Sequence, residues 1–312
     1  MYAYIGRRIL ATIPVVAIIA LIVFLMLRLS GNPAAIIAGD TATQEQIEAI
    51  SAQLGLSRPA HEQFVIWAVD VLRGDLGQSI YFQLPVAKLI GQRLEPTLLL
   101  TLSTMSFAIL LAVPLGILAA WFAGTWIDRA IMALAVFAFS LPVFVIAYAL
   151  VYVFSIELSW LPVQGYKSLA DGISPFALHI LLPTVSLGLL YMALLARMTR
   201  SSFLEVLNQD YIRTARSKGL SSSQVLIWHA LKNASVPIVT TIGSGIAILI
   251  GGVVVTESVF GIPGIGRLTV DALLRRDYPV IQGIILVFAF FYVFINLAID
   301  LLYTLLDPRI RY

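Results

Sequence analysis

The sequence predicts an all-α membrane protein with six transmembrane helices. Its 312 residues are 60% hydrophobic and only 12% charged, whereas soluble domains carry about 25% charged residues. Six intervals without a charged side chain are long enough to cross a hydrocarbon core about 30 Å thick as a helix. Lipid requires every backbone polar group to be paired within the segment, and the alternating strands of a transmembrane barrel are absent from the sequence.

The predicted spans differ in length: four can cross with some tilt, and the first and last are near the minimum. They occupy residues 9–27, 96–127, 130–156, 172–196, 233–256 and 278–299, the last continuing to about 306. The first span follows two arginines, as the apolar region of a secretory signal peptide would. Its apolar stretch exceeds the usual length of about 7 to 15 residues and no small-x-small cleavage site follows, so we interpret it as a retained helix.

Basic residues predict the orientation, because cytoplasmic loops are enriched in Lys and Arg. With the amino terminus inside, the inner segments hold 11 basic and five acidic residues, against nine basic and 12 acidic residues in the longer outer segments. The inner basic residues are Arg7, Arg8, Arg129, Arg197, Arg200, Arg213, Arg216, Lys218, Lys232, Arg309 and Arg311. We therefore expect both termini in the cytoplasm.

Prolines lie inside five of the six predicted spans, at positions 14, 114, 142, 183 and 237. Neighbouring helices and water satisfy the carbonyl groups that a proline frees in a membrane, so kinked spans are common. Ordinary bending explains them at least as well as a gate does, and no single proline is assigned a role.

The predicted outer segment, residues 30–95, carries the punctuation of two short helices. Thr43 and Gln46 form a capping-box pattern, and Gly55 lies where that helix should stop. A second helix should begin near 57–59 and end at Gly74, with one apolar face. That face consists of Phe64, Trp67, Ala68 and Val71. The pattern supports equally a lid on the bilayer surface and a docking platform.

The longest predicted inner loop, residues 197–232, has the pattern of a folded segment. Asp210 can cap a helix over 211–218, with Gly219 at the left-handed stop position and Leu220 placed for the closing hydrophobic contact. Ser221 and Gln224 form a second capping box that leads into the fifth span. We expect a short exposed helix held on a tight turn.

This helix has two features of a protein-binding surface. Ala215 and Gly219 are small and lie at i and i+4, and three basic residues, Arg213, Arg216 and Lys218, can meet acidic groups. An inner loop contains basic residues in any case. Periodicity alone therefore supports a protein contact and an ordinary loop about equally.

Four runs of residues resemble a known family. The run 210–220, Asp-Tyr-Ile-Arg-Thr-Ala-Arg-Ser-Lys-Gly-Leu, resembles the EAA loop of ABC importer permeases in its peptide and nickel branch; of the general Glu-Ala-Ala-x-x-x-Gly pattern it keeps the second Ala and the Gly. The runs 74–79, 257–268 and 306–312 resemble the first membrane subunit of dipeptide and oligopeptide systems. The glycine-rich pieces are individually ordinary turns, and their order and spacing carry the resemblance.

The resemblance implies a type I ABC importer permease fold in a bacterial cytoplasmic membrane, with residues 1–29 as tail and first helix, 30–95 as a helical outer segment and 96–312 as the transmembrane core. It implies a second homologous permease subunit, two ATP-binding subunits or domains that bind ATP and Mg²⁺, and an extracytoplasmic substrate-binding protein.

The implied ATPase-coupling residues are Asp210, Tyr211, Arg213, Thr214, Ala215, Arg216, Lys218, Gly219 and Leu220. The implied receptor-facing residues are Glu257, Phe260, Gly261, Pro263, Gly264 and Gly266. Dipeptides or oligopeptides are the implied substrates, with nickel and glutathione as alternatives.

Several absent patterns support this interpretation. No Gly-x-x-x-x-Gly-Lys-Ser/Thr motif occurs, so ATP would be hydrolysed on another chain. The sequence has no cysteine and no catalytic cluster, its three histidines are scattered, and its net charge of +3 is small, so neither an enzyme, a bound cofactor nor a nucleic-acid partner is expected. The rival class is an ion-coupled secondary transporter. Such carriers place ionisable residues near the bilayer centre, and Asp300, which comes closest, lies about a turn and a half from the inner end of its span.

Overall fold

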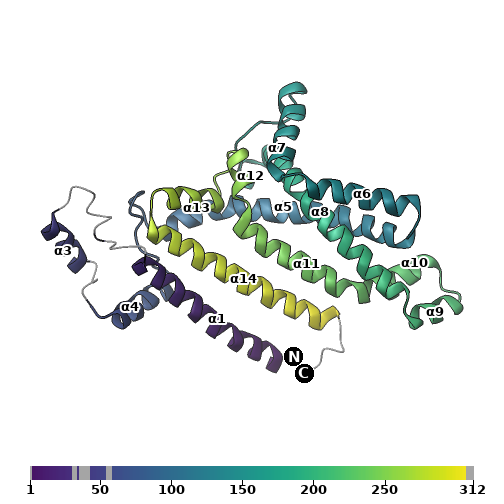
Figure 1. The fold of residues 1–312 in the computed structure, drawn as a ribbon, viewed down its shortest axis with the longest axis horizontal. Coiled ribbons are helices and arrows are strands. Elements are labelled where there is room, and N and C mark those ends of the chain that lie inside the picture. Colours follow the sequence, from purple (N-terminus) through teal and green to yellow (C-terminus); the bar gives the residue numbers. More distant parts are fainter. Residues whose placement is uncertain (1, 30–33, 35–42, 54–57, 307–312) are drawn as a thin grey trace.

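The structure is a computed structural model that describes residues 2–29, 34, 43–53 and 58–306. The described chain is almost entirely helical and contains no strand, only one isolated bridge between Gln78 and Pro85. Its long helices lie roughly alongside one another in an elongated bundle (Figure 1). The predicted all-α class is confirmed.

Five helices of the described chain are long and apolar enough to cross a membrane. They are α1 (Tyr2–Leu29), α5 (Val86–Trp121), α8 (Ile173–Leu207), α11 (Leu231–Gly252) and α14 (Tyr278–Leu306). Three of them are longer than predicted: α1 and α5 begin ahead of residues 9 and 96, and α8 continues beyond residue 196. The prediction marked only their uncharged stretches, whereas a helix can extend into water at either end without breaking its hydrogen-bond ladder.

The predicted third span is not one helix. It consists of α6 (Trp126–Ser140), followed by α7 (Val143–Val151) and the π-helix η1 (Tyr152–Glu157), with a bend of 95° between the two parts. The ring of Pro142 disfavours a helical conformation of Leu141, which has ψ 132° and ends α6. The sixth span is therefore present only if the bent pair is counted as one. The other predicted span prolines lie within continuous helices.

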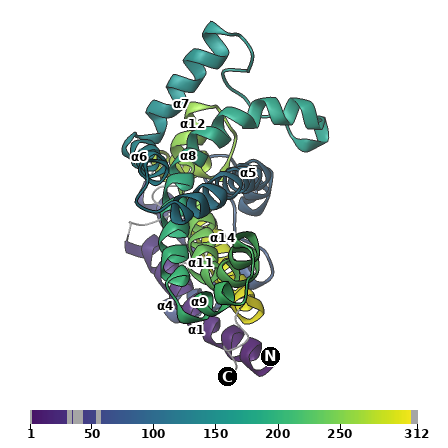
Figure 2. The same ribbon diagram turned by 90° about the vertical axis from the view of Figure 1, so that its right-hand side faces the viewer.

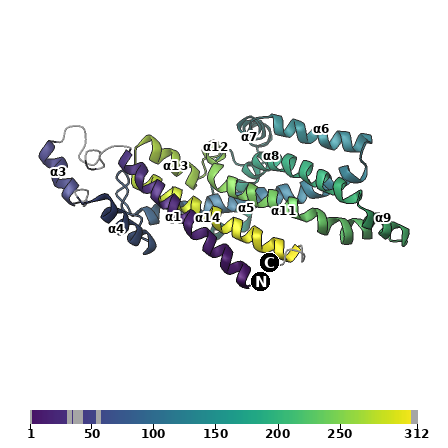
Figure 3. The same cartoon turned by 60° about the horizontal axis from the view of Figure 1, so that its bottom comes forward.

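The packing of the bundle centres on α5 and α8, which make the most extensive contact among the described helices. The two helices approach closely where one of them has a glycine: a Cβ on Gly116 would lie 2.6 Å from Cβ of Thr199. On one side α11 packs on α8, and α14 then packs on α11 (Figure 2). α1 covers the outside of α14 (Figure 3), where Arg8 forms a 3.0 Å ion pair with Asp300.

The predicted outer helices are α3 (Gln44–Gln53) and α4 (Ala60–Leu72). The Thr43 and Gln46 capping bonds are present at 2.9 and 3.4 Å, whereas the predicted stop at Gly55 lies outside the described residues. The predicted apolar face of α4 packs on α1, where the ring of Phe24 meets Phe64 and Trp67 at 5.3 and 5.7 Å between centroids. This contact ties the outer segment to the first span.

Shorter elements connect the spans. They are the 3₁₀ turn η2 (Leu169–Asp171), α9 (Asp210–Ser217), α10 (Ser222–Gln224), the π-helix η3 (Val225–Ala230), α12 (Val254–Val259) and α13 (Ile265–Leu274). The start of α1, the end of α14 and α9 lie toward one end of the bundle, and α3, α4 and α13 lie toward the other (Figure 1). The first group contains segments that the sequence predicts to be inner, and the second contains segments that it predicts to be outer.

Candidate functional site

The short helix α9 stands at the end of the bundle between α8 and α11, as predicted, but its start differs from the prediction. Gln209 occupies the N-cap position and makes no side-chain capping bond. Asp210 is already helical, and its carboxylate pairs at 3.3 Å with Arg213 one turn on, where both side chains are exposed. The expectation that Asp210 caps the helix is therefore wrong, although an acidic residue in the first turn still favours the helix dipole.

The end of α9 is the left-handed stop that the sequence predicts. Gly219 has φ +79°, a conformation that glycine adopts without a Cβ clash. The amide of Leu220 donates to the carbonyl of Ala215 at 3.4 Å and the amide of Gly219 donates to that of Arg216 at 3.0 Å, the two bonds of a Schellman ending. Directly afterwards Ser221 starts α10 with a complete capping box. The turn is thus fixed at both ends.

The inner face of α9 is buried in the bundle. Ile212 and Ala215 belong to a hydrophobic cluster with Phe203 of α8, Val225 of η3 and alanines of α5 and α11. Ala215 is only 5% exposed, so the expectation that it lies on the surface beside Gly219 is wrong. At i and i+3 from one another, Ile212 and Ala215 share the face that the bundle covers.

Two polar contacts join α9 and its supporting helices to their neighbours. The guanidinium of Arg216 lies over the ring of Trp121 at the end of α5, 5.8 Å from its centroid. The guanidinium of Arg200 on α8 donates two hydrogen bonds, of 2.6 and 2.7 Å, to Asp128 at the start of α6. The Asp128 carboxylate also accepts the amide of Gly124 at 2.9 Å. A bidentate pair of this kind fixes orientation as well as distance.

The outer face of α9 is exposed and mainly basic. Its exposed predicted coupling residues are Asp210, Tyr211, Arg213, Thr214, Arg216, Lys218 and Gly219, with Leu220 half-buried. A Cβ on Gly219 would meet no atom within 4 Å, so open space surrounds this turn. The site therefore presents a basic outer surface, while its inner face belongs to a hydrophobic cluster that also contains residues of α5, α8 and α11.

The predicted receptor-facing loop has a different construction. Glu257 is fully buried on α12 and accepts hydrogen bonds from the hydroxyl of Thr97 at 2.6 Å and the amide of Arg267 at 2.8 Å. Burial raises the pKa of its carboxyl. A Cβ on Gly264 would collide with this carboxylate, so only glycine fits there.

Four of the six predicted receptor-facing residues are accordingly not at the surface. Glu257, Phe260, Gly264 and Gly266 are buried, whereas Gly261 and Pro263 are partly exposed. The glycine-rich pattern was interpreted as a surface turn. In the structure the same glycines let the chain close around a buried acid.

Sequence reasoning missed the partners of the buried acids. Thr97 lies 160 residues from Glu257. Asp277 is fully buried before α14 and accepts hydrogen bonds from Ser79, which ends the 74–79 run, and from Ile80 and Tyr81 directly after it. No pattern in a single sequence pairs residues so far apart. The one available signal is that each acid lies next to an apolar segment, where an unpaired charge is costly.

The spanning bundle with a short helix docked at one end has the fold of the permease subunits of type I ABC importers. Its fold is similar to that of a chain in the inward facing MetNI methionine ABC transporter, with a TM-score of 0.57 over 70% of this chain and 96% of that chain at 16% identity. At this identity the likeness concerns the fold alone.

The chain belongs to the family of binding-protein-dependent transport system inner membrane components. The family profile matches residues 112–312, and the profile of its N-terminal region matches residues 1–87. The chain is 52% identical to a probable peptide ABC transporter permease protein of Sinorhizobium fredii and 43% identical to the glutathione transport system permease protein GsiC of Escherichia coli, each over 100% of both chains. It is thus a multi-pass, non-catalytic membrane subunit of an ABC importer, which confirms the predicted family and excludes the secondary transporter.

Proposed function

We propose that this chain forms half of a peptide translocation pathway and that ATP hydrolysis on separate subunits drives transport through α9. The peptide assignment rests on relatives over the whole chain, one named for peptide and one for glutathione. Glutathione is itself a short peptide, so both names describe substrates with peptide bonds. The absence of a phosphate-binding loop motif supports hydrolysis on a partner chain.

The observation that carries the coupling role is the way α9 is attached. An eight-residue helix is too short to be stable by itself, so its shape depends on Ile212 and Ala215, the contact between Arg216 and Trp121, and the two fixed turns. A force on the exposed face would therefore act on the end of α5 through Trp121 and on α11 through η3, on which α9 packs. The exposed arginines and lysine suit a partner surface with acidic groups.

The proposed assembly contains a second homologous permease subunit, two ATP-binding subunits or domains that hold ATP and Mg²⁺, and an extracytoplasmic substrate-binding protein. We place the complex in a bacterial cytoplasmic membrane with both termini in the cytoplasm. The excess of basic residues in the predicted inner segments supports this orientation. The position of α9 at the same end as the start of α1 is consistent with it (Figure 1).

The outer loop after α11 is proposed to meet the substrate-binding protein through its exposed positions. Gly261 and Pro263 are partly exposed and Arg267 is exposed, whereas Glu257 and Gly264 would maintain the shape of the loop from inside. Crosslinkers placed at Pro263 and Arg267 are expected to capture the binding protein, and a loop that captures nothing in the assembled complex contradicts this part.

Uptake by the assembled complex tests the proposed function. The chain is purified with the products of its neighbouring genes and placed in liposomes, with labelled dipeptide, oligopeptide, glutathione or nickel outside and ATP inside. We expect ATP-dependent uptake of a peptide that is unaffected by a protonophore. Uptake of nickel alone would overturn the peptide assignment, and uptake that needs a proton gradient but no ATP would overturn the coupling.

A further inference from the structure

Apart from the charged Lys232 at its start, the exposed described residues of α11 form a single row along the helix. They recur every three or four residues, the spacing of one helical face. We call the following residues the α11 stripe: Asn233, Pro237, Thr240, Ser244, Ile248 and Gly251. The stripe offers the amide of Asn233 and the hydroxyl groups of Thr240 and Ser244, whereas Pro237, Ile248 and Gly251 have no polar side-chain atom.

The exposed faces of other spanning helices are different. On α1 the described exposed side chains between residues 10 and 26 are all apolar, and Leu10 is 64% exposed. On α5 the exposed residues between 102 and 118 are aliphatic except for Ser106, and Leu110 is 72% exposed. Lipid tails cannot hydrogen-bond, so these faces suit lipid and the α11 stripe does not.

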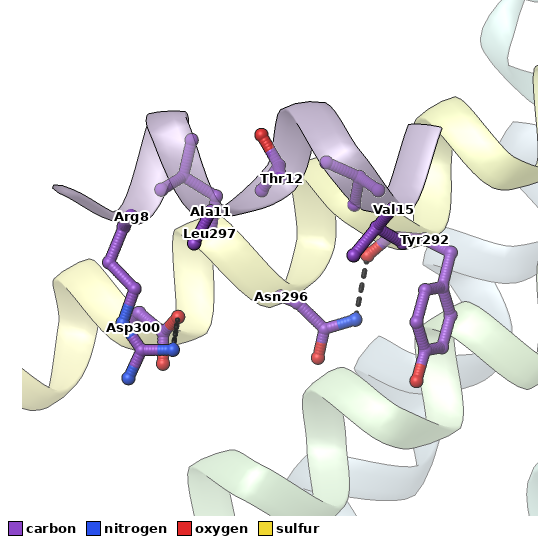
Figure 4. A pocket seen from close by; sticks show the side chains of 9 residues that line it. Arg8, Ala11, Thr12, Val15, Tyr292, Asn296, Leu297 and Asp300 are labelled. Atoms are coloured by element: carbon purple, nitrogen blue, oxygen red, sulfur yellow. Dashed lines mark hydrogen bonds and ion pairs between the residues drawn. The ribbon is translucent and has the colours of Figure 1, made fainter. Parts of the chain in front are cut away.

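A polar face of α14 continues the stripe. The hydroxyl of Tyr303 hydrogen-bonds that of Thr240, which fixes where the two helices meet. Asn296 and Tyr292 lie seven and 11 residues before Tyr303, on the same face of α14. Both are exposed and line a cavity of about 310 Å³ (Figure 4), which the ion pair between Arg8 and Asp300 also borders.

The stripe ends at the coupling site. Asn233 and Pro237 line a second cavity, of about 260 Å³, together with Ser202 of α8, the N-cap residue Gln209 and Tyr211 of α9. Along the chain, α9 leads through α10 and η3 directly into α11. A displacement of α9 would therefore be delivered first to the helix that carries the stripe.

We infer that the α11 stripe, with Tyr292 and Asn296, lines the water-filled path along which the substrate crosses the membrane. The identity of the solute rests on the proposed function. Neutral hydroxyl and amide groups can exchange hydrogen bonds with the N–H and C=O groups that all peptides share. With no charged residue within the stripe, the path discriminates little between peptide side chains.

The natural absence of cysteine makes the test direct. Thr240→Cys and Ser244→Cys are introduced singly into the complete complex, with Leu110→Cys as a control on a lipid-facing helix. Membranes are treated with a small, positively charged methanethiosulfonate reagent. The cysteine thiolate attacks the reagent's sulfenyl sulfur, which forms a mixed disulfide and releases methanesulfinate, and because the thiolate forms only in contact with water, the reaction requires water at the sulfur. We expect both stripe thiols to react at least about tenfold faster than the control, a saturating transported peptide to slow this reaction, and the modification to block uptake.

Two results would overturn the inference. If the stripe thiols react no faster than Leu110→Cys with ATP, ADP or no nucleotide, the face is covered by the second permease or by lipid. If they react but peptide gives no protection and uptake continues after modification, the water there is not on the substrate path. Uptake by the unmodified variants is measured in parallel. If either result is found in a complex that still takes up peptide with ATP, only the pathway inference fails. If the complex takes up no peptide with ATP, the proposed function itself fails.

Discussion

The buried Ile212 gives the sharpest test of how α9 is held. Its side chain is fully buried in the cluster beneath the helix. Ile212→Ala leaves a cavity, and such core truncations cost about 2–5 kcal/mol. Because α9 is too short to persist without this contact, we expect the loss to appear as local opening of residues 210–217 while the spanning bundle stays folded. The lower limit corresponds to about 30-fold faster amide exchange in this segment.

The assay measures two quantities on the reconstituted complex: amide exchange of α9, and peptide transported per ATP hydrolysed. Ile212→Ala should raise the first and lower the second. Ile212→Val, which costs about 0.5–1.5 kcal/mol, should fall between it and the wild type. Ser217→Ala is the matched control on the exposed face, because Ser217 is outside the coupling set and its hydroxyl bonds only its own helix. Wild-type exchange and wild-type transport per ATP in Ile212→Ala would refute the reasoning.

Four further substitutions test the turns and the buried acids, with Gly91→Ala as the common control because a Cβ there meets no atom within 4 Å. Gly219→Ala should destabilise the left-handed stop by about 1 kcal/mol and speed protease cleavage beside it; unchanged cleavage would count against the turn. Gly264→Ala should lower the melting temperature in detergent, because its methyl group has no room beside the buried carboxylate, and a melting temperature equal to that of the control would contradict this packing. Asp128→Asn should lower the melting temperature by removing the charged partner of Arg200, a loss of about 1.5–3 kcal/mol. Arg200→Lys should lower it less, because lysine keeps the charge without the bidentate geometry. Equal melting temperatures of the wild type and these two variants would show that the pair contributes nothing to stability.

The sequence predicted the parts of the fold that depend on local chemistry. Uncharged intervals located the spans, and the capping residues around Thr43, Gly219 and Ser221 predicted three turns that the structure contains. Each of these signals arises within a few residues of the feature it marks. The bend at Pro142 was the exception, because a proline in a span is compatible with either a kink or a break and the packing of the two halves decides between them.

The parts that were missed depend on contacts between distant residues. Ala215 was expected on the surface, since its small size suits a protein contact, and it is buried because α9 is docked on Phe203 and Val225. Glu257 was expected to face a receptor, but it is buried and accepts a hydrogen bond from Thr97. A short pattern states that a residue is small or acidic. Which side of the chain is covered follows only from the tertiary packing.

The contact between α9 and an ATP-binding subunit is the most direct test of the central claim that this permease is driven through this helix. A cysteine at the exposed Arg213, in the otherwise cysteine-free chain, is combined with single surface cysteines on the co-purified ATP-binding subunit. Trp126→Cys, 77% exposed at the start of α6, serves as the control. The account predicts a disulfide from position 213 that forms in the complete complex, depends on the nucleotide and stops peptide uptake, with none from position 126. A complex that transports peptide at the wild-type rate with position 213 never within reach of the ATP-binding subunit would contradict it.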